Sequence, residues 1–190
     1  GGPLTALSPD FTQSGMVVGG MNYSNLLNRS SDWPAYGQLF EGSYRDELEQ
    51  PLALNLVQML WDRGEPNGYA HRMTNNPPPN TPKHRINLIV AVGDHQVSNF
   101  TSDIWARTAG FVTNQGGIDD TRWPNYDDLW NVKRLKAAEY PYTGSSITYY
   151  DSGPYRTNPL DPGGDNIGTG VPPIPNLAPN PQWEDPHGAP

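Results

Sequence analysis

The sequence predicts an α/β fold built on a small parallel sheet, and two observations support this. Three short apolar runs, at residues 15–19, 86–92 and 146–150, have the composition of strands. The segments between them carry helical spacing and end in glycines that stop helices. Strands that alternate with helices in this way are typical of a parallel sheet.

The run at 86–92 is the clearest of the three predicted strands. It is almost continuously apolar and β-branched, which indicates a central strand covered on both faces. The run at 15–19 is short and does not alternate, whereas 146–150 is rich in strand-forming residues and precedes the turn at 151–153. About three strands leave exposed sheet edges, so we expect further strands from elsewhere.

Two helices have clear boundaries in the sequence. The first begins at Pro51 and stops at Gly64, and the second can be capped by Ser98 or Asn99 and ends at Gly110. A shorter helical stretch is predicted across 127–138. The apolar face of the first helix follows the spacing i, i+4, i+7 and i+8 with Leu52, Leu56, Met59 and Leu60.

The composition indicates one domain with long loops. The chain has 190 residues with 20 Gly and 21 Pro, and its loop inserts lie at 22–44 and 65–83 of a core that spans 1–155. Residues 156–190 form a Pro- and Gly-rich loop or tail. A formal charge of −8 argues against nucleic acid as a partner, and no apolar run is long enough to span a membrane. The chain contains no cysteine, which excludes disulfides and thiolate sites.

The strongest chemical signal follows the central predicted strand. Gly93 allows a sharp turn, and Asp94 then presents a carboxylate at the carboxyl end of the strand, where ligands bind in open parallel sheets. The alternative is that Asp94 only caps this turn, because Asp is common in turns.

The pattern strand–Gly–Asp–x–x–Val–helix resembles the segment of α/β-hydrolases that carries the acid of the catalytic triad. The wider chain is similar to a group of bacterial, mostly uncharacterised α/β-hydrolases over most of residues 1–155. The residues that carry the resemblance lie at 20–24, 58–64, 68–71 and 93–97. It implies that the chain is the C-terminal half of a serine-type hydrolase or esterase.

In that fold the triad follows the chain order serine, acid, histidine, with the serine in a G-x-S-x-G turn. No such turn occurs in this sequence, and residues 1–10 resemble the helix that follows it. The resemblance therefore implies that the nucleophile lies upstream of Gly1 or on another chain, and that this segment is the required partner. The chain by itself is then expected to be inactive.

The resemblance also assigns roles to the remaining residues. His187, the last histidine, takes the place of the catalytic base and is oriented by Asp94. His71, Tyr23 and Trp61 are expected to bind a small-molecule or polymeric ester substrate, without a cofactor or a metal. His84 is expected at the surface.

Two alternatives to the hydrolase remain open. The first is a non-catalytic binding or interaction domain with a Pro-rich tail. The second is a metal-dependent hydrolase that uses His71, Asp94 and His95, although no spacing here matches a strong ligand motif such as H-E-x-x-H.

Overall fold

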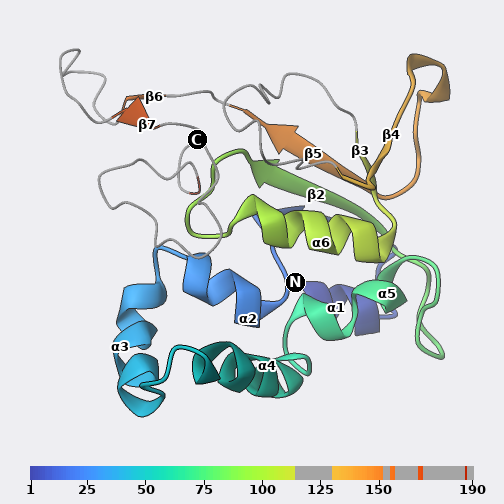
Figure 1. The fold of residues 1–190 in the computed structure, drawn as a ribbon. Coiled ribbons are helices and arrows are strands. Elements are labelled where there is room, and N and C mark those ends of the chain that lie inside the picture. The colour runs from blue at the N-terminus through green and yellow to red at the C-terminus, as the bar shows by residue number, and fades with distance from the viewer. Residues whose placement is uncertain (114–129, 152–154, 157–166, 169–186, 188–190) are drawn as a thin grey trace.

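The computed structural model describes residues 1–113, 130–151, 155–156, 167–168 and 187, and it has the predicted α/β class (Figure 1). Five parallel strands form one sheet in the order β1-β2-β5-β3-β4. The three predicted runs are its three longer strands, and two short strands that the sequence analysis missed widen it. The strands are β1 (Gln13–Val17), β2 (Arg85–Ala91), β5 (Ser146–Tyr150), β3 (Val112–Thr113) and β4 (Lys133–Arg134). A separate antiparallel pair joins β6 (Tyr155–Arg156) to β7 (Ile167–Gly168).

Both clearly bounded helices form close to where they were predicted, as α4 and α6. Gly110 ends α6 in the left-handed region, at φ 72°, which glycine adopts at little cost. The insert at 22–44 is not a plain loop, because it contains α2 and α3. The helices are α1 (Gly2–Leu7), α2 (Tyr23–Leu26), α3 (Trp33–Ser43), α4 (Glu49–Trp61), α5 (Ala70–Met73) and α6 (Asn99–Ala109).

The helix predicted across 127–138 is wrong for the part of that stretch that the structure describes. Residues 130–138 contain β4 and the start of a short 3-10 turn at Ala137–Glu139 instead. β4 pairs with β3, so sheet hydrogen bonds override the local helical composition. No helix in the described part of the chain is long and apolar enough to cross a membrane.

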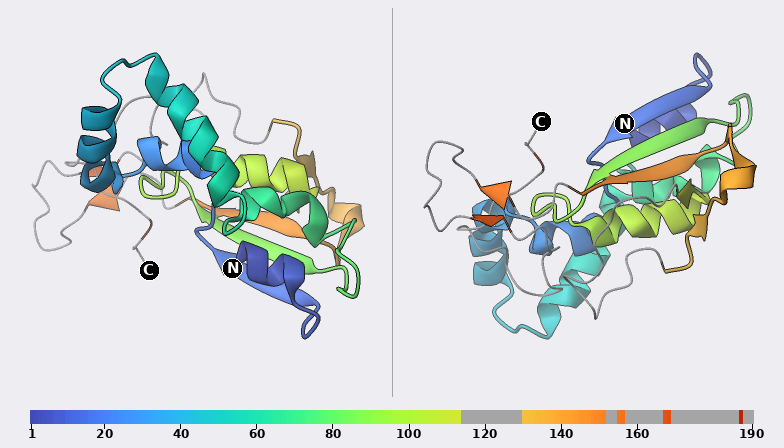
Figure 2. Two further views of the ribbon diagram at one scale, coloured as in Figure 1. Left: turned by 90° about the horizontal axis from the view of Figure 1, so that it is seen from below. Right: turned by 90° about the horizontal axis from the view of Figure 1, so that it is seen from above.

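The core lies between one face of the sheet and the helices that cover it (Figure 2). The alternate residues Ile86, Leu88 and Val90 of β2 point inward and are at most 1% exposed. They share the core cluster with Trp105 of α6 and Met73 of α5. Burial of this apolar face is the main force that holds β2 against the helices.

The other face of β2 is not covered in the way the sequence predicted. Arg85 and Asn87 are exposed, and burial alternates along the strand. The Oδ1 atom of Asn87 accepts hydrogen bonds from Ser146 at 3.1 Å and from Thr148 at 3.2 Å, both on β5. The expectation of a strand buried on both faces is therefore wrong for the amino-terminal half of β2, whereas Ile89 and Ala91 further along the same face are partly buried.

Two further expectations about burial are corrected. The apolar face predicted for α4 points outward, and the helix packs inward through Ala53, Leu54 and Gln58. His84 is only 2% exposed rather than on the surface. Its ring packs edge-on against Phe11, with centroids 5.4 Å apart.

Candidate active site

The turn after β2 is fixed by one side chain from the start of α6. The backbone N–H of Gly93 donates to Asn99 Oδ1 at 2.8 Å, and Asn99 Nδ2 donates to the Ala91 carbonyl at 2.7 Å. Gly93 itself has φ 86°, which favours glycine. Asn99 thus ties the end of the strand to the helix rather than capping the helix. These two hydrogen bonds fix the direction in which the backbone leaves the sheet at Asp94.

Asp94 is fully buried and uses its two carboxylate oxygens for different purposes. Oδ1 accepts from the backbone N–H groups of Gln96 at 2.9 Å and Val97 at 2.6 Å. Oδ2 lies 2.9 Å from Nδ1 of His187. Asp94 therefore caps its turn and also faces the last histidine.

His187 lies 93 positions after Asp94 in the sequence, and the fold brings the two side chains into contact. Its side chain is 23% exposed, so one part of the ring is in contact with the buried carboxylate and another part is accessible. It lies on the wall of a cavity of about 520 Å³. The walls come from the start of α1, the end of β1, the loop that leads into α2 and the turn after Asp94, and they include Gly1, Gly2, Pro3, Val18, Gly20, Tyr23, Ser30, Asp32, Gln96 and Val97.

Tyr23 and Trp61, which were predicted to bind substrate, have different positions in this site. Tyr23 lines the cavity directly. Burial, and then the charge of Glu65, raise the pKa of its phenol above the ordinary value. Trp61 does not line the cavity but packs edge-on against Tyr23, with ring centroids 6.0 Å apart.

The residue that sequence reasoning missed is Glu65. It is 2% exposed and accepts hydrogen bonds from the backbone N–H groups of Asn22 and Tyr23, both at 3.1 Å. It also accepts from Asn67 N at 2.8 Å and Gln58 Nε2 at 2.5 Å. The carboxylate thereby holds the start of α2 against the cavity, where Asn22 adopts a positive φ of 64°. The local sequence contains no signal for this, because the contact joins segments 42 and 43 residues apart.

His71 is not part of this site. It is exposed on α5, and the next residue after that helix, Thr74, hydrogen-bonds the carbonyl of Ala109 at the far end of α6 from Asp94. His95 is buried beside Asp94, and its carbonyl accepts from Ser31 N at 2.8 Å. The trio of His71, Asp94 and His95 is therefore not brought together. Among the described residues no group of three or more His, Cys, Asp or Glu side chains could hold a metal ion.

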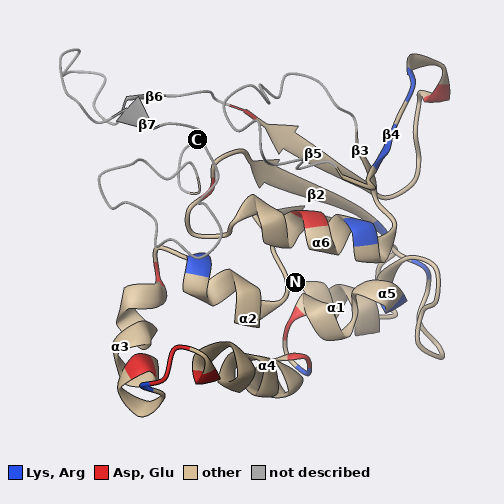
Figure 3. Ribbon diagram, viewed as in Figure 1, with Lys and Arg blue, Asp and Glu red and all other residues tan. Residues whose placement is uncertain are grey.

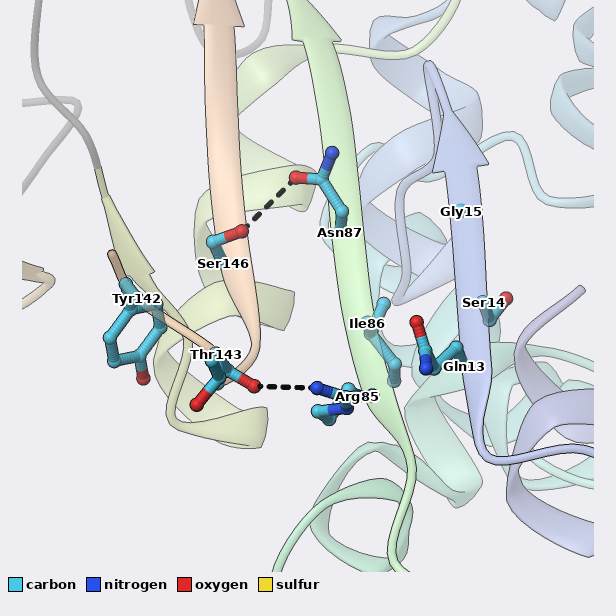
Figure 4. A pocket seen from close by; sticks show the side chains of 10 residues that line it. Gln13, Ser14, Gly15, Arg85, Ile86, Asn87, Tyr142, Thr143 and Ser146 are labelled. Carbon is cyan, nitrogen blue, oxygen red and sulfur yellow. Dashed lines mark hydrogen bonds between the residues drawn. The ribbon is translucent and has the colours of Figure 1, made fainter. Parts of the chain in front are cut away.

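A second cavity, of about 450 Å³, lies on the polar face of the sheet (Figure 4). Gln13, Arg85 and Ser146 contribute to it from the amino ends of β1, β2 and β5. Asp94 follows the carboxyl end of β2, so this cavity and the pair of Asp94 and His187 are at opposite ends of the strands. The polar cavity therefore does not belong to the candidate active site.

The structure thus places the carboxylate of Asp94 against one ring nitrogen of His187, at 2.9 Å. A carboxylate that accepts a hydrogen bond from one ring nitrogen fixes the tautomer of an imidazole. A comparison with protein-family models gives no match, and searches of curated proteins and of solved structures give none either.

Proposed function

We propose that this chain supplies the acid and the base of a serine-type hydrolase that cleaves an ester or a related acyl bond. The observation that carries the proposal is the contact of 2.9 Å between Asp94 Oδ2 and His187 Nδ1 on the wall of a cavity. Asp94 follows the carboxyl end of a parallel strand, the edge at which open α/β sheets place their reacting groups.

In the proposed reaction Asp94 holds the Nδ1–H tautomer of His187. The Nε2 atom accepts the proton of a serine hydroxyl while the serine oxygen attacks the acyl carbon, and the imidazolium is stabilised by Asp94. His187 then gives this proton to the leaving alkoxide as the acyl bond breaks. Water, activated by the same nitrogen, releases the acid and restores the serine.

The serine itself is proposed to come from a segment before Gly1 or from another chain. Gly1, Gly2 and Pro3 line the same cavity as His187, so a preceding segment would enter the site directly. β1 is at one edge of the sheet, and its residue Val17 is 64% exposed. Leu4 of α1 is 65% exposed. Such an edge can pair with a further strand.

A fluorophosphonate probe tests the proposal, because it forms a covalent bond only with an activated serine. We expect labelling in the protein that contains both this chain and the nucleophile segment, on a peptide outside residues 1–190. His187→Ala should abolish that labelling. The chain alone should remain unlabelled.

Ser30 provides the internal control for this experiment. It is the one serine among the described residues that line the cavity, and it is 1% exposed. Labelling of the isolated chain that disappears in Ser30→Ala would place the nucleophile within this chain and overturn the proposal of an external serine. Labelling that survives His187→Ala would show that His187 is not the base.

A further inference from the structure

Two rows of residues lie on the polar face of the sheet, near the amino ends of its strands. In the first row Gln13 of β1 is the register partner of Arg85 on β2. In the second row Asn87 lies between Gly15 of β1 and Ser146 of β5. Since alternate residues of a strand point to the same face, Arg85 and Asn87 project to one side, about 6–7 Å apart along β2. These residues line the cavity of about 450 Å³ that is shown in Figure 4.

Arg85 brings a positive charge to this cavity. Its guanidinium donates a hydrogen bond from Nη1 to the carbonyl oxygen of Thr143 at 3.4 Å (Figure 4). Among the described residues no Asp or Glu forms an ion pair with Arg85, and no acidic side chain of the described chain lines the cavity. A guanidinium has five N–H donors in a planar fork that matches a carboxylate. Most donors of Arg85 are therefore available to an anion.

Asn87 places an amide donor beside this charge. Its Oδ1 atom accepts from the hydroxyls of Ser146 at 3.1 Å and Thr148 at 3.2 Å, and Figure 4 shows Nδ2 pointing away from Ser146. On the other side of Asn87 lies Gly15, where an added Cβ atom would meet nothing within 4 Å. The space next to the amide is therefore open toward β1, and a ligand can accept a hydrogen bond from Nδ2.

The rest of the cavity is lined mainly by uncharged polar side chains. They include Gln13, Tyr142 and Thr143. Gly144 allows Tyr142 to lie close to the chain, because a Cβ atom at Gly144 would clash with the tyrosine hydroxyl. Amide and hydroxyl groups of this kind both donate and accept, which suits the hydroxyl groups of a ligand. The volume lies within the range of about 300–1,000 Å³ that is usual for small-molecule sites.

The charges at this end of the sheet favour a ligand with a single negative charge. Lys83 and Arg85 lie at the start of β2, and β4 is basic, whereas acidic residues gather in the segment between α3 and α4 (Figure 3). Lys133 of β4 is already paired with Glu139 at 2.6 Å. Arg85 is the one cation among the described residues that line the cavity. It balances one carboxylate, but not a phosphate monoester with a charge of about −1.5 to −2 at pH 7.

We infer that this cavity binds a small hydroxylated carboxylate, of the chemical class of the sugar acids. The carboxylate pairs with the guanidinium of Arg85, and hydroxyl groups of the ligand meet Asn87 and the uncharged polar side chains around it. Binding here is independent of the proposed hydrolase, because Asp94 lies at the other end of the strands.

Isothermal titration calorimetry of the full 190-residue chain tests this inference, with D-glucuronate as the probe. We expect a Kd of about 1 mM or lower at low ionic strength. D-Glucose lacks the carboxylate and acetate lacks the hydroxyl groups, so each should bind about tenfold or more weakly than D-glucuronate. Equal binding of glucose or acetate would overturn the assigned ligand class, as would tighter binding of inorganic phosphate. No binding of D-glucuronate up to about 10 mM would overturn the site itself.

Two variants locate the binding in this cavity. Arg85→Gln removes the charge and should raise the Kd for D-glucuronate about tenfold or more. Arg134→Gln is the matched control, because Arg134 is exposed on β4 and does not line the cavity, and it should leave the Kd unchanged.

Asn87→Asp keeps an acceptor for Ser146 and Thr148 but replaces the donor with an oxygen that repels a carboxylate, so it should also weaken binding about tenfold or more. Urea unfolding checks that both variants are folded, which is expected because Arg85 and Asn87 are exposed. Unchanged binding of D-glucuronate in either folded variant would overturn the inference. None of these residues lines the cavity with His187, so such a result would leave the proposed hydrolase untouched.

Discussion

The Nδ1 atom of His187 lies 2.9 Å from Oδ2 of Asp94, while Oδ1 of the same carboxylate is held by two backbone N–H groups. The carboxylate is therefore held by its own turn through one oxygen and faces the histidine with the other. A substitution at Asp94 therefore acts on both the turn and the histidine. The two effects can be separated by the choice of substituent.

Asp94→Asn should keep the turn and remove the orientation of the base. The Asn oxygen can still accept from Gln96 and Val97, but its NH₂ group then faces His187 Nδ1 and favours the tautomer with the proton on Nε2. That tautomer cannot take a proton from serine, so we expect hydrolysis by the proposed serine-type hydrolase to fall by about 10⁴-fold with little loss of stability. Ester hydrolysis and urea unfolding measure the two effects. Asp94→Ala should lose both activity and about 1–2 kcal/mol of stability, because the turn also loses its acceptor.

Gly20→Ala should destabilise the loop between β1 and α2. A Cβ atom at Gly20 would lie 2.4 Å from Thr101 Oγ1 and 2.7 Å from Val97 Cγ1, both well inside contact distance. We expect the free energy of unfolding to fall by about 1–3 kcal/mol, as for other overpacked sites. Gly15→Ala is the matched control, because a Cβ there meets nothing within 4 Å. Equal unfolding curves for the two variants would show that the loop does not pack against α6 as described.

Glu65→Gln should cost about 2–4 kcal/mol of stability, because it turns one buried acceptor into a donor that faces backbone N–H groups. The four donors to Glu65 come from α4, from the start of α2 and from the turn at Asn67. The measurement is urea unfolding, with Glu47→Gln on the exposed segment before α4 as the control. The control should change stability by less than about 0.5 kcal/mol. A Glu65→Gln variant as stable as the control would rule out this anchoring role.

Stability should fall at high pH in a way that depends on Tyr23. Burial and Glu65 raise the pKa of Tyr23 in the folded chain above the ordinary tyrosine pKa of about 10. The unfolded chain then loses the phenolic proton first, so the stability gained from the neutral phenol is complete below about pH 10 and is lost as pH rises toward the folded pKa. Unfolding midpoints between about pH 9 and pH 11 should therefore drop more steeply in the wild type than in Tyr23→Phe. Parallel slopes for the two proteins would contradict this account.

Local patterns were sufficient to predict the main elements. The strand at 146–150 was predicted with its observed bounds, and the strand at 86–92 is displaced by one residue from β2. Gly110 was predicted to end a helix and does so as a left-handed residue, because this conformation is set by a single glycine. β3 and β4 were missed because strands of two residues have no periodicity and exist only through their pairing with neighbours.

Local sequence patterns also failed to predict which side chains are buried. The spacing of Leu52, Leu56 and Leu60 correctly indicated a helix, yet spacing alone does not say which side of a helix faces the core. In the fold α4 turns Leu54 and Gln58 inward, because Gln58 donates to the buried Glu65 and accepts from the backbone of α2 at Ser24. The hydrogen bonds of Gln58 with Ser24 and Glu65, rather than the hydrophobic periodicity, therefore set the orientation of α4.

For the candidate site, the sequence by itself determined the local structures on which the candidate residues stand. Asp94 follows a strand and a glycine, and the residues that encode both features directly precede it. Only the tertiary structure decided which side chains meet: it brings His187 to Asp94, places Tyr23 on the cavity wall and leaves His71 at the other end of α6. The physical reason is that a turn is fixed by the residues within it, whereas a contact across 93 positions depends on how the whole sheet and its loops pack.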